Sequence, residues 1–432
     1  MLGKTRSRGV FAGTGSLAMM LVLISVPLTT AVALSSSSAT STTSSGPYVG
    51  YTLFLGNNTL WPGNVIPSGI KGGPTAIQAS PNGYVYVDGP PYLQAISDTT
   101  NRVAVKITGP QGADIMDMAY DSSNGDLYLT NSASNSVVVV STATNAVVAN
   151  ITLGPFSNVD GNVIPAPWGI VYDSSNGNLY VGSMESNGTS WLSVIDGATN
   201  EVVKAQIALP SVVTGYGYNI STPSALGYDP QNKCVYVPGE YFTLQGYPEY
   251  SLVTVMNTTT NTILTNVKVI PWPTLFAFDP ENGFVYVSSG GTHYISVING
   301  KTNTMIGNVS LGGLGSTFGL AFDPTNGYLY VTAYGFESNA VSVIDPATNE
   351  LIATIPAGDT PEWITYDPSN GDMYVVNGFS NTISVIVTPS AMPWWVEFEY
   401  LATGVVIVAA PVAVYLLAVR RKVRKAQPPR IL

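Results

Sequence analysis

The chain has 432 residues, only 10% of them charged, and contains 43 glycines, 30 prolines and 25 tyrosines. This composition is typical of many short strands joined by tight turns, and it argues against long charged helices. Between Leu34 and Pro393, 24 acidic residues outnumber seven basic ones. The composition therefore predicts an all-β protein. Because such an excess of negative charge repels phosphate backbones, we expect that it does not bind nucleic acid.

Residues 1–33 have the features of an export signal. Three basic residues among the first nine precede an apolar run over 17–28, and Ala31-Val32-Ala33 supplies the small residues that a signal peptidase requires. We expect this segment to be cleaved; an uncleaved N-terminal anchor is the alternative, and both place the next domain outside the cell. Residues 34–46, rich in Ser and Thr, form a linker that cannot build a core.

The other end of the chain predicts a membrane anchor. Residues 401–419 carry no charge and are long enough for a helix that crosses a bilayer. Residues 391–400 contribute interfacial aromatic side chains, and the basic tail 420–432 is of the kind retained in the cytoplasm. The expected topology is a single-pass protein of the cell membrane, with an extracellular domain and a cytoplasmic C-terminus.

One phrase recurs seven times between these ends. Its clearest copy runs from Tyr366-Asp367-Pro368 through Asn370-Gly371 to Tyr374-Val375. The second tyrosine of the phrase returns at intervals of 42 to 56 residues, the size of a four-stranded blade. Each copy continues into two further strands, such as 341–345 and 351–355. The repeat predicts a seven-bladed β-propeller over 47–390, with four antiparallel strands in each blade.

The seventh repeat ends after its third strand, at 383–387, so its fourth strand must come from elsewhere in the chain. Gly63–Gly69 resembles Ala353–Gly358, which is the end of the fourth strand in the sixth repeat. We therefore expect the N-terminal part of the domain to complete the seventh blade and close the ring.

The repeats resemble the YVTN-family β-propellers of archaeal and bacterial surface-layer and secreted proteins. Tyr330-Val331-Thr332 and Tyr128-Leu129-Thr130-Asn131 are the nearest copies of the naming motif. The resemblance covers about residues 47–390 and implies the fold and a place at the cell surface. The repeat residues are structural, so the resemblance supplies neither a catalytic residue nor a ligand.

Few side chains are available for catalysis or metal binding. His293 is the only histidine, which excludes most metal and triad chemistry, and the only cysteine, Cys234, excludes an intrachain disulfide. The segments 121–126 and 367–372 loosely resemble calcium loops, but Asx turns explain them equally well. We expect no cofactor and no metal.

Repeat lengths point to one face of the disc, around blades three to five, as a binding surface. The turns between strands one and two and between strands three and four stay short, whereas insertions fill 154–167, 183–190, 210–223 and 238–250. All four insertions are expected on the opposite face, and a growing loop is where binding surfaces arise. The candidate binding residues on that face are Met116, Trp168, Ser224, Glu240, Tyr241, Trp272, Thr274, His293, Phe318, Glu362 and Trp363.

An exported chain exposes its glycosylation sequons, which here are Asn57, Asn150, Asn187, Asn219, Asn257 and Asn308. The expected location at the cell surface and the scarcity of catalytic side chains together favour a non-catalytic binding or envelope scaffold protein. Its expected partner is an envelope protein or a glycan. A lactonase-like or lyase-like extracytoplasmic enzyme and an accessory subunit of a membrane complex are the alternatives. The acidic composition and the single histidine also favour an archaeon living in acid.

Overall fold

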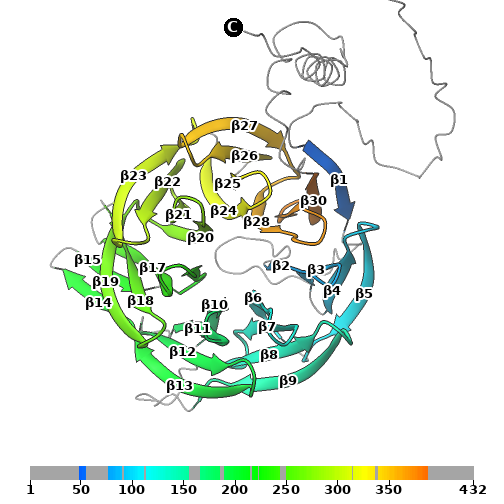
Figure 1. Cartoon of the computed structure of the whole chain (residues 1–432), viewed down its shortest axis with the longest axis horizontal. Helices are drawn as coiled ribbons and strands as arrows, with labels where there is room; N and C mark the ends of the chain where they lie inside the picture. The colour runs from blue at the N-terminus through cyan, green and yellow to red at the C-terminus, as the bar shows by residue number, and fades with distance from the viewer. Residues whose placement is uncertain are drawn as a thin grey trace, which may run out of the picture. The chain divides into compact units, whose positions relative to one another are not determined.

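A computed structural model describes residues 48–54, 76–89, 92–110, 113–154, 166–184, 189–214, 217–221, 223–243, 250–313, 315–335 and 339–387. These residues form a seven-bladed β-propeller, as the repeat predicts. Figure 1 shows the blades arranged around a central channel, with the chain running once around the ring. The expected export signal, linker, juxtamembrane segment, membrane helix and tail all lie outside the described residues. Within the described residues, no helix is long and apolar enough to cross a membrane.

Each blade is an antiparallel sheet whose strands run in order from the channel to the rim. The innermost strands are β2 (Ile77–Ser80), β6 (Ile115–Asp121), β10 (Ala166–Asp173), β16 (Gly227–Asp229), β20 (Pro273–Asp279), β24 (Ser316–Asp323) and β28 (Pro361–Tyr366). The second strands are β3 (Tyr84–Gly89), β7 (Asp126–Asn131), β11 (Asn178–Met184), β17 (Cys234–Thr243), β21 (Phe284–Ser289), β25 (Tyr328–Tyr334) and β29 (Met373–Asn377).

The two outer positions of each blade complete the sheet. The third strands are β4 (Tyr92–Ser97), β8 (Ser136–Ser141), β12 (Ser190–Asp196), β18 (Ser251–Asn257), β22 (Tyr294–Asn299), β26 (Ala340–Asp345) and β30 (Thr382–Val387). The outermost strands are β5 (Arg102–Thr108), β9 (Ala146–Thr152), β13 (Glu201–Ala208), β19 (Thr262–Val269), β23 (Thr304–Ser310), β27 (Glu350–Pro356) and, in blade 7, β1 (Tyr48–Phe54).

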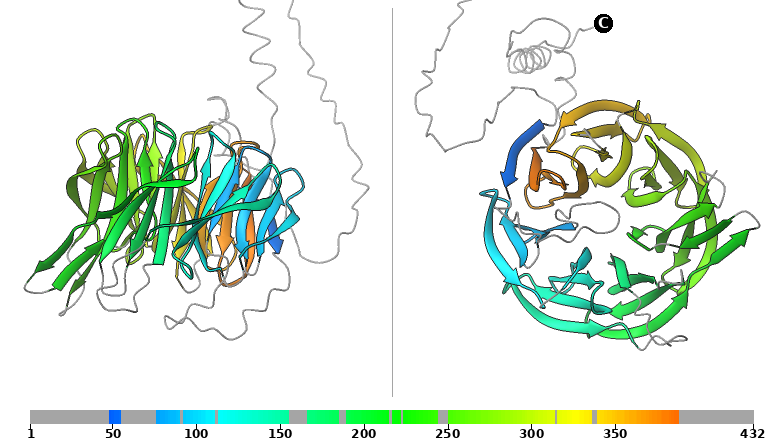
Figure 2. Two further views of the ribbon diagram at one scale, coloured as in Figure 1. Left: turned by 90° about the horizontal axis from the view of Figure 1, so that it is seen from below. Right: turned by 180° about the vertical axis from the view of Figure 1, so that it is seen from behind.

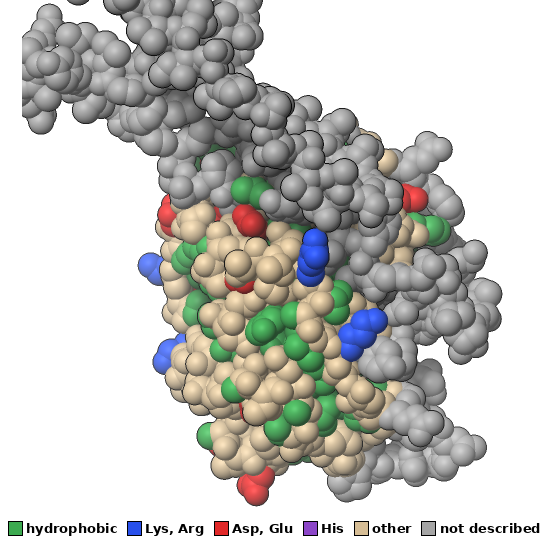
Figure 3. All heavy atoms as spheres, turned by 90° about the vertical axis from the view of Figure 1, so that its right-hand side faces the viewer, with side chains coloured by type: hydrophobic (Ala, Val, Ile, Leu, Met, Phe, Trp, Pro, Cys, Tyr) green, Lys and Arg blue, Asp and Glu red, His purple; other side chains and the backbone are tan. Residues whose placement is uncertain are grey.

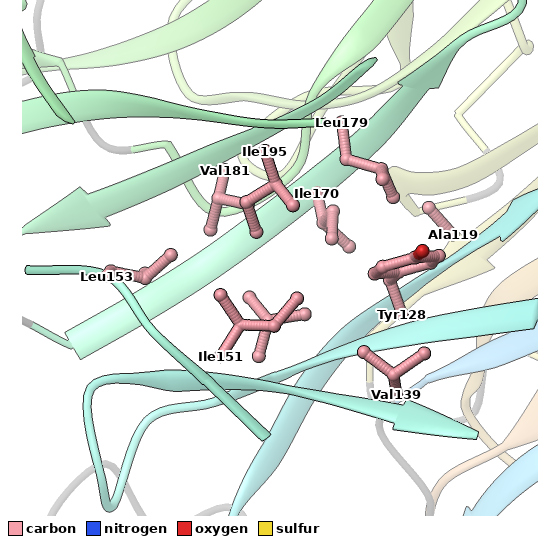
Figure 4. Close-up of a cluster of buried hydrophobic side chains, with 10 residues drawn as sticks. Ala119, Tyr128, Val139, Ile151, Leu153, Ile170, Leu179, Val181 and Ile195 are labelled. Carbon is pink, nitrogen blue, oxygen red and sulfur yellow. The ribbon is translucent and has the colours of Figure 1, made fainter. Parts of the chain in front are cut away.

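The core lies between neighbouring blades rather than within any one of them. Figure 4 shows one such cluster, in which Tyr128 and Val139 of blade 2 pack against Ile170, Leu179 and Ile195 of blade 3. The second and third strands are buried along almost their whole length, because they have a neighbouring blade on both faces. The outermost strands leave most of their residues exposed, in agreement with their polar sequences.

A tyrosine at the same position of the second strand joins six of the seven blades to the next, blade 6 with its Tyr330 being the exception. The Tyr128 hydroxyl donates to the side-chain oxygen of Asn200 at 2.7 Å, and Tyr236 does the same to Asn303 at 2.8 Å. The asparagine always comes from the turn between strands three and four of the following blade. There it has a positive φ, 59° at Asn200, which asparagine adopts more readily than other residues with a side chain. The repeat motif is thus an interlock between blades.

Ring closure by the N-terminal part of the domain is confirmed, but the segment that closes the ring differs from the expected one. β1 pairs with β30 from Tyr48 opposite Val387 to Phe54 opposite Thr382. It covers the entire outer edge of β30, so the assignment of Gly63–Gly69 to this position was wrong. Gly63–Gly69 itself lies outside the described residues.

Blade 4 is larger than the repeat predicts. β17 continues to Thr243, and its extension pairs with β15 (Gly217–Ser221), which in turn pairs with β14 (Ser211–Thr214). The insertions over 210–223 and 238–250, interpreted as loops from the sequence, therefore fold in part into one sheet. Figures 1 and 2 show β14 and β15 projecting beyond the rim of the ring.

Candidate functional site

The antiparallel blades place their connections on two faces. Turns between strands one and two and between strands three and four share one face, which we call the turn face. Connections between strands two and three and from one blade to the next share the other, which we call the top face. The described residues at both ends of each of the four insertions therefore lie at the top face.

Aromatic side chains gather on the top face at blades 6 and 7. The Phe318 ring lies 5.4 Å from that of Tyr334 and meets the Trp363 ring edge-on at 6.1 Å. All three side chains are half-buried. Phe379, in the connection between β29 and β30 of blade 7, is 46% exposed. The structure therefore brings two predicted residues, Phe318 and Trp363, into one aromatic cluster.

Glu362 adds a carboxyl group beside this cluster. Its side chain rests on Gly378, where an added Cβ would come within 2.5 Å of Glu362 Oε1. Burial, together with the nearby charge of Asp88, raises the pKa of Glu362 to about 7. Both the protonated and the ionised carboxyl are therefore populated near neutral pH. The protonated form can donate a hydrogen bond to a ligand, and the ionised form can accept one.

Interblade hydrogen bonds hold the backbone at the predicted positions on the innermost strands. The Thr130 hydroxyl donates to the carbonyl of Trp168 at 2.7 Å, and the Thr332 hydroxyl to that of Glu362 at 2.6 Å. The Ser288 hydroxyl does the same to Phe318 at 2.5 Å. The side chains at these positions are thus displayed from a rigid scaffold.

Trp272 and His293 lie in blade 5. Trp272 has a φ of 56°, a strained conformation for a bulky residue. Its ring is clamped over Gly291, because a Cβ there would lie 1.8 Å from the ring atom Cε3. The half-buried His293 ring stacks on Tyr294 with centroids 4.3 Å apart.

The remaining predicted residues are dispersed among other blades. Met116 and Ser224 are half-buried in blades 2 and 4, and the Thr274 hydroxyl is hydrogen-bonded to Ser288 in blade 5 at 2.7 Å. Glu240 and Tyr241 belong to β17 and pair with β15, whereas the sequence placed them in a loop. Their side chains lie outside the described part of the structure.

A cavity of about 500 Å³ occupies the channel, and it shares only Trp363 with the predicted residues. Its walls come from the innermost strands of blades 1, 2, 3, 4, 5 and 7. The cavity extends to Pro81, Ser174 and Pro368, which belong to turns between strands one and two, so it leads towards the turn face. The cavity and the aromatic cluster are therefore two different sites.

Of the described residues that line the cavity, Asp117 is the only one with a charged side chain. Its two carboxylate oxygens accept hydrogen bonds from the backbone N–H groups of Met118 at 2.8 Å and Ile170 at 2.9 Å. Burial nevertheless raises the pKa of Asp117 to about 7, the two hydrogen bonds lowering it only in part.

Sequence reasoning missed Asp117, Tyr334 and Phe379. A signal for Asp117 was present, since aligning the repeats on their tyrosines places Gly169, Ala225, Leu275 and Gly319 at its position. A carboxyl group at a position that is otherwise small or apolar marks a departure from the structural repeat. Tyr334 and Phe379 carry no such signal, because Tyr334 ends β25 beside a connection of variable length and Phe379 lies within such a connection.

The surface of the ring carries few charges. Figure 3 looks onto the rim near β5 and shows mostly uncharged atoms, with isolated basic and acidic side chains. Among the described residues, no group of three or more His, Cys, Asp or Glu side chains could hold a metal ion.

Comparison with known proteins identifies the fold alone. No protein-family model matches the chain, and no curated protein matches it. Among solved structures, hydrazine synthase from Kuenenia stuttgartiensis is similar with a TM-score of 0.59 and 18% identity, over 74% of this chain and 96% of that one. The β-propeller domain of Cps50 (Swd1) from Myceliophteria thermophila is similar with a TM-score of 0.56 and 11% identity, over 79% of this chain and 100% of that one.

Proposed function

We propose that this protein is a cell-surface β-propeller of the YVTN type that recognises a glycan of the cell envelope through its top face, without catalysing a reaction. The observation that carries the proposal is the cluster of Phe318, Tyr334 and Trp363 around the Glu362 carboxyl. Sugar rings present apolar C–H faces that pack on aromatic rings and hydroxyls that bind carboxyl groups. A half-buried aromatic cluster with one carboxyl offers both contacts.

Rigidity supports a role in recognition. Hydrogen bonds from the preceding blade fix the backbone at Phe318 and Glu362, so little conformational entropy is lost when a ligand docks there. An envelope protein is the second partner class for this surface, since aromatic clusters also anchor protein interfaces.

The test measures binding of the detergent-solubilised full chain to glycans released from its native envelope. We expect Phe318→Leu and Glu362→Gln each to weaken binding about tenfold or more, with little change in melting temperature. Ile306→Ala, which removes a half-exposed aliphatic side chain from the rim in β23, is the matched control. Binding that survives both top-face substitutions contradicts the proposed site. Binding of envelope proteins but not of glycans would assign the surface to the second partner class.

We also propose that the domain is exported and held at the membrane by residues 401–419. The uncharged stretch and its basic flank over 420–432 support this topology. Protease added to intact cells is expected to remove the propeller and to spare the C-terminal tail. Release of the whole protein by an alkaline carbonate wash would contradict membrane anchoring.

A further inference from the structure

The channel cavity has the size and lining of a small-molecule site. Its volume of about 500 Å³ lies within the range of about 300–1,000 Å³ of ligand pockets in proteins. Most of its lining is apolar or aromatic, as in such pockets, and the polar side chains are few. They include Gln78, Asp117 and Thr365.

The charge balance of the cavity is one-sided. Among the described residues, Asp117 contributes the only ionisable carboxyl of the lining, and no basic residue lines the cavity. The six Lys and Arg side chains of the described residues are all exposed, four on outermost strands and two in turns of the turn face. A buried carboxylate without a cationic neighbour is costly, as the raised pKa of Asp117 shows. The cavity therefore favours a guest that brings a positive charge.

Interblade packing alone does not account for Asp117. Its carboxylate joins blade 2 to Ile170 of blade 3, yet blades 3 to 6 place Gly, Ala, Leu and Gly at the equivalent position and blade 7 places Trp363. At Gly169, for example, an added Cβ would lie 2.7 Å from the carbonyl oxygen of Pro223 in the next blade. Ring closure thus does not require a carboxyl at this position. The carboxyl of Asp117 in blade 2 is a chemical group that the fold alone does not need.

Aromatic rings surround the cavity between Asp117 and the turn face. Tyr120, Tyr172 and Tyr366 occupy equivalent positions near the ends of β6, β10 and β28, and Trp363 lies in the same wall. The Tyr172 hydroxyl interacts with Ser123 of the preceding blade, and that of Tyr366 with Thr325. Because these hydroxyls point towards a neighbouring blade, the rings themselves are left to line the cavity. Aromatic faces attract cations most strongly where water is excluded.

We propose that the channel cavity binds a small organic cation of the alkylammonium class, with Asp117 as counter-ion and the tyrosine and tryptophan rings as cation–π partners. This site shares Trp363 with the aromatic cluster of the top face, but the cavity leads towards the turn face. It makes the propeller a receptor for a cationic small molecule that enters from the turn face.

Choline and its neutral isostere 3,3-dimethyl-1-butanol test the proposal, because the two have the same shape and differ in charge. Calorimetry on the full-length, detergent-solubilised protein is expected to show choline binding at least about tenfold more tightly than the isostere. Equal affinities would show that the cavity selects apolar shape alone, and no binding of either would overturn the proposal outright. This comparison uses only the natural chain, so it does not depend on whether a variant folds.

Asp117→Asn then locates the binding site. The amide keeps an acceptor oxygen for one of the two backbone N–H groups but removes the charge, and choline affinity should fall at least about tenfold. Glu350→Gln removes one negative charge from the exposed outermost strand of blade 6 and should leave the affinity unchanged. Choline affinity that is equal in Asp117→Asn and the natural chain, or reduced as much by Glu350→Gln, would place the cation elsewhere on the acidic surface.

Discussion

The Tyr374 hydroxyl donates a hydrogen bond to the side-chain oxygen of Asn101 across the junction of blades 7 and 1, with 3.0 Å between the two oxygens. The two residues are 273 positions apart in the chain, so this bond forms only once the ring has closed. The same hydroxyl accepts a hydrogen bond from Asn370, which fixes its orientation. Closure thus repeats the interlock found at five other blade junctions, where a tyrosine hydroxyl also donates to an asparagine of the following blade.

Tyr374→Phe is expected to lower the free energy of unfolding by about 0.5–1.5 kcal/mol, because it removes the hydroxyl that bonds the half-buried Asn101 and the exposed Asn370. Tyr294→Phe is the control, since this tyrosine is 38% exposed on an outer strand and should tolerate the change. Denaturant unfolding monitored by tryptophan fluorescence measures both variants. An equal, small effect of the two substitutions would mean that the interlock does not stabilise the ring.

The repeat encodes this interlock locally, which is why the sequence predicts the number of blades and the order of their strands. Tyr374 and its equivalents keep a fixed spacing from the Asn-Gly turn before them, and burial on both sides explains the apolar residues around them. Each blade repeats the same sequence motif, so the seven copies together predict the fold more firmly than any one copy does.

The misassigned elements depend on pairing over long distances, which local patterns do not encode. β1 follows no Thr-Asn turn, unlike the outermost strands of the other blades, and so it lacks the mark by which those strands are recognised. β15 and the extension of β17 are separated by an entire innermost strand and turn, and neither resembles the repeat. The position of Asp117 in a cavity likewise emerges only when six blades surround the channel.

Deleting Tyr48–Phe54 should be enough to destabilise the ring, because β30 would then present an unpaired edge. We expect a lower melting temperature, broader unfolding and aggregation on heating. Replacing Gly63–Gly69 by a glycine–serine segment of equal length should leave the melting temperature nearly unchanged, since β1 already covers that edge. Differential scanning calorimetry distinguishes the two changes, and the reverse order of their effects would restore the assignment made from the sequence.

Acidification from pH 8 to pH 5 should stabilise the domain. Asp117 and Glu362 have pKa values of about 7 in the folded protein, above the ordinary values of 3.8 and 4.5 for these side chains. The folded state therefore binds more protons than the unfolded state between about pH 4 and pH 7, and stability is lost as pH rises through this range. For Asp117 the effect is at most about 4 kcal/mol, at roughly 1.4 kcal/mol for each pKa unit.

Melting curves at several pH values measure this dependence, and Asp117→Asn should flatten it because the amide does not titrate. The double variant with Glu362→Gln should flatten it further. A domain that loses stability steadily between pH 8 and pH 5 would contradict the burial of these two carboxyls, and with it the expectation of a protein suited to acid.

Glycosylation should be selective among the three sequons whose side chains are described. Asn150 and Asn308 lie on the outermost strands β9 and β23 with the asparagine and the hydroxyl residue two positions later both exposed. Asn257 instead uses its side-chain oxygen within a turn, accepting hydrogen bonds of 3.0 Å from the backbone N–H groups of Thr259 and Thr260. A transferase that acts on the folded chain must break that turn to reach Asn257, whereas it meets no such obstacle at the rim. Glycopeptide mass spectrometry of protein from native membranes should therefore find glycans at Asn150 and Asn308 and little or none at Asn257.

Asn150→Gln and Asn308→Gln should each increase electrophoretic mobility by one step, while Asn257→Gln should leave mobility unchanged and lower the melting temperature. Full occupancy of Asn257 would show that modification precedes folding of blade 4, and an unmodified rim would remove glycosylation from the proposed surface chemistry.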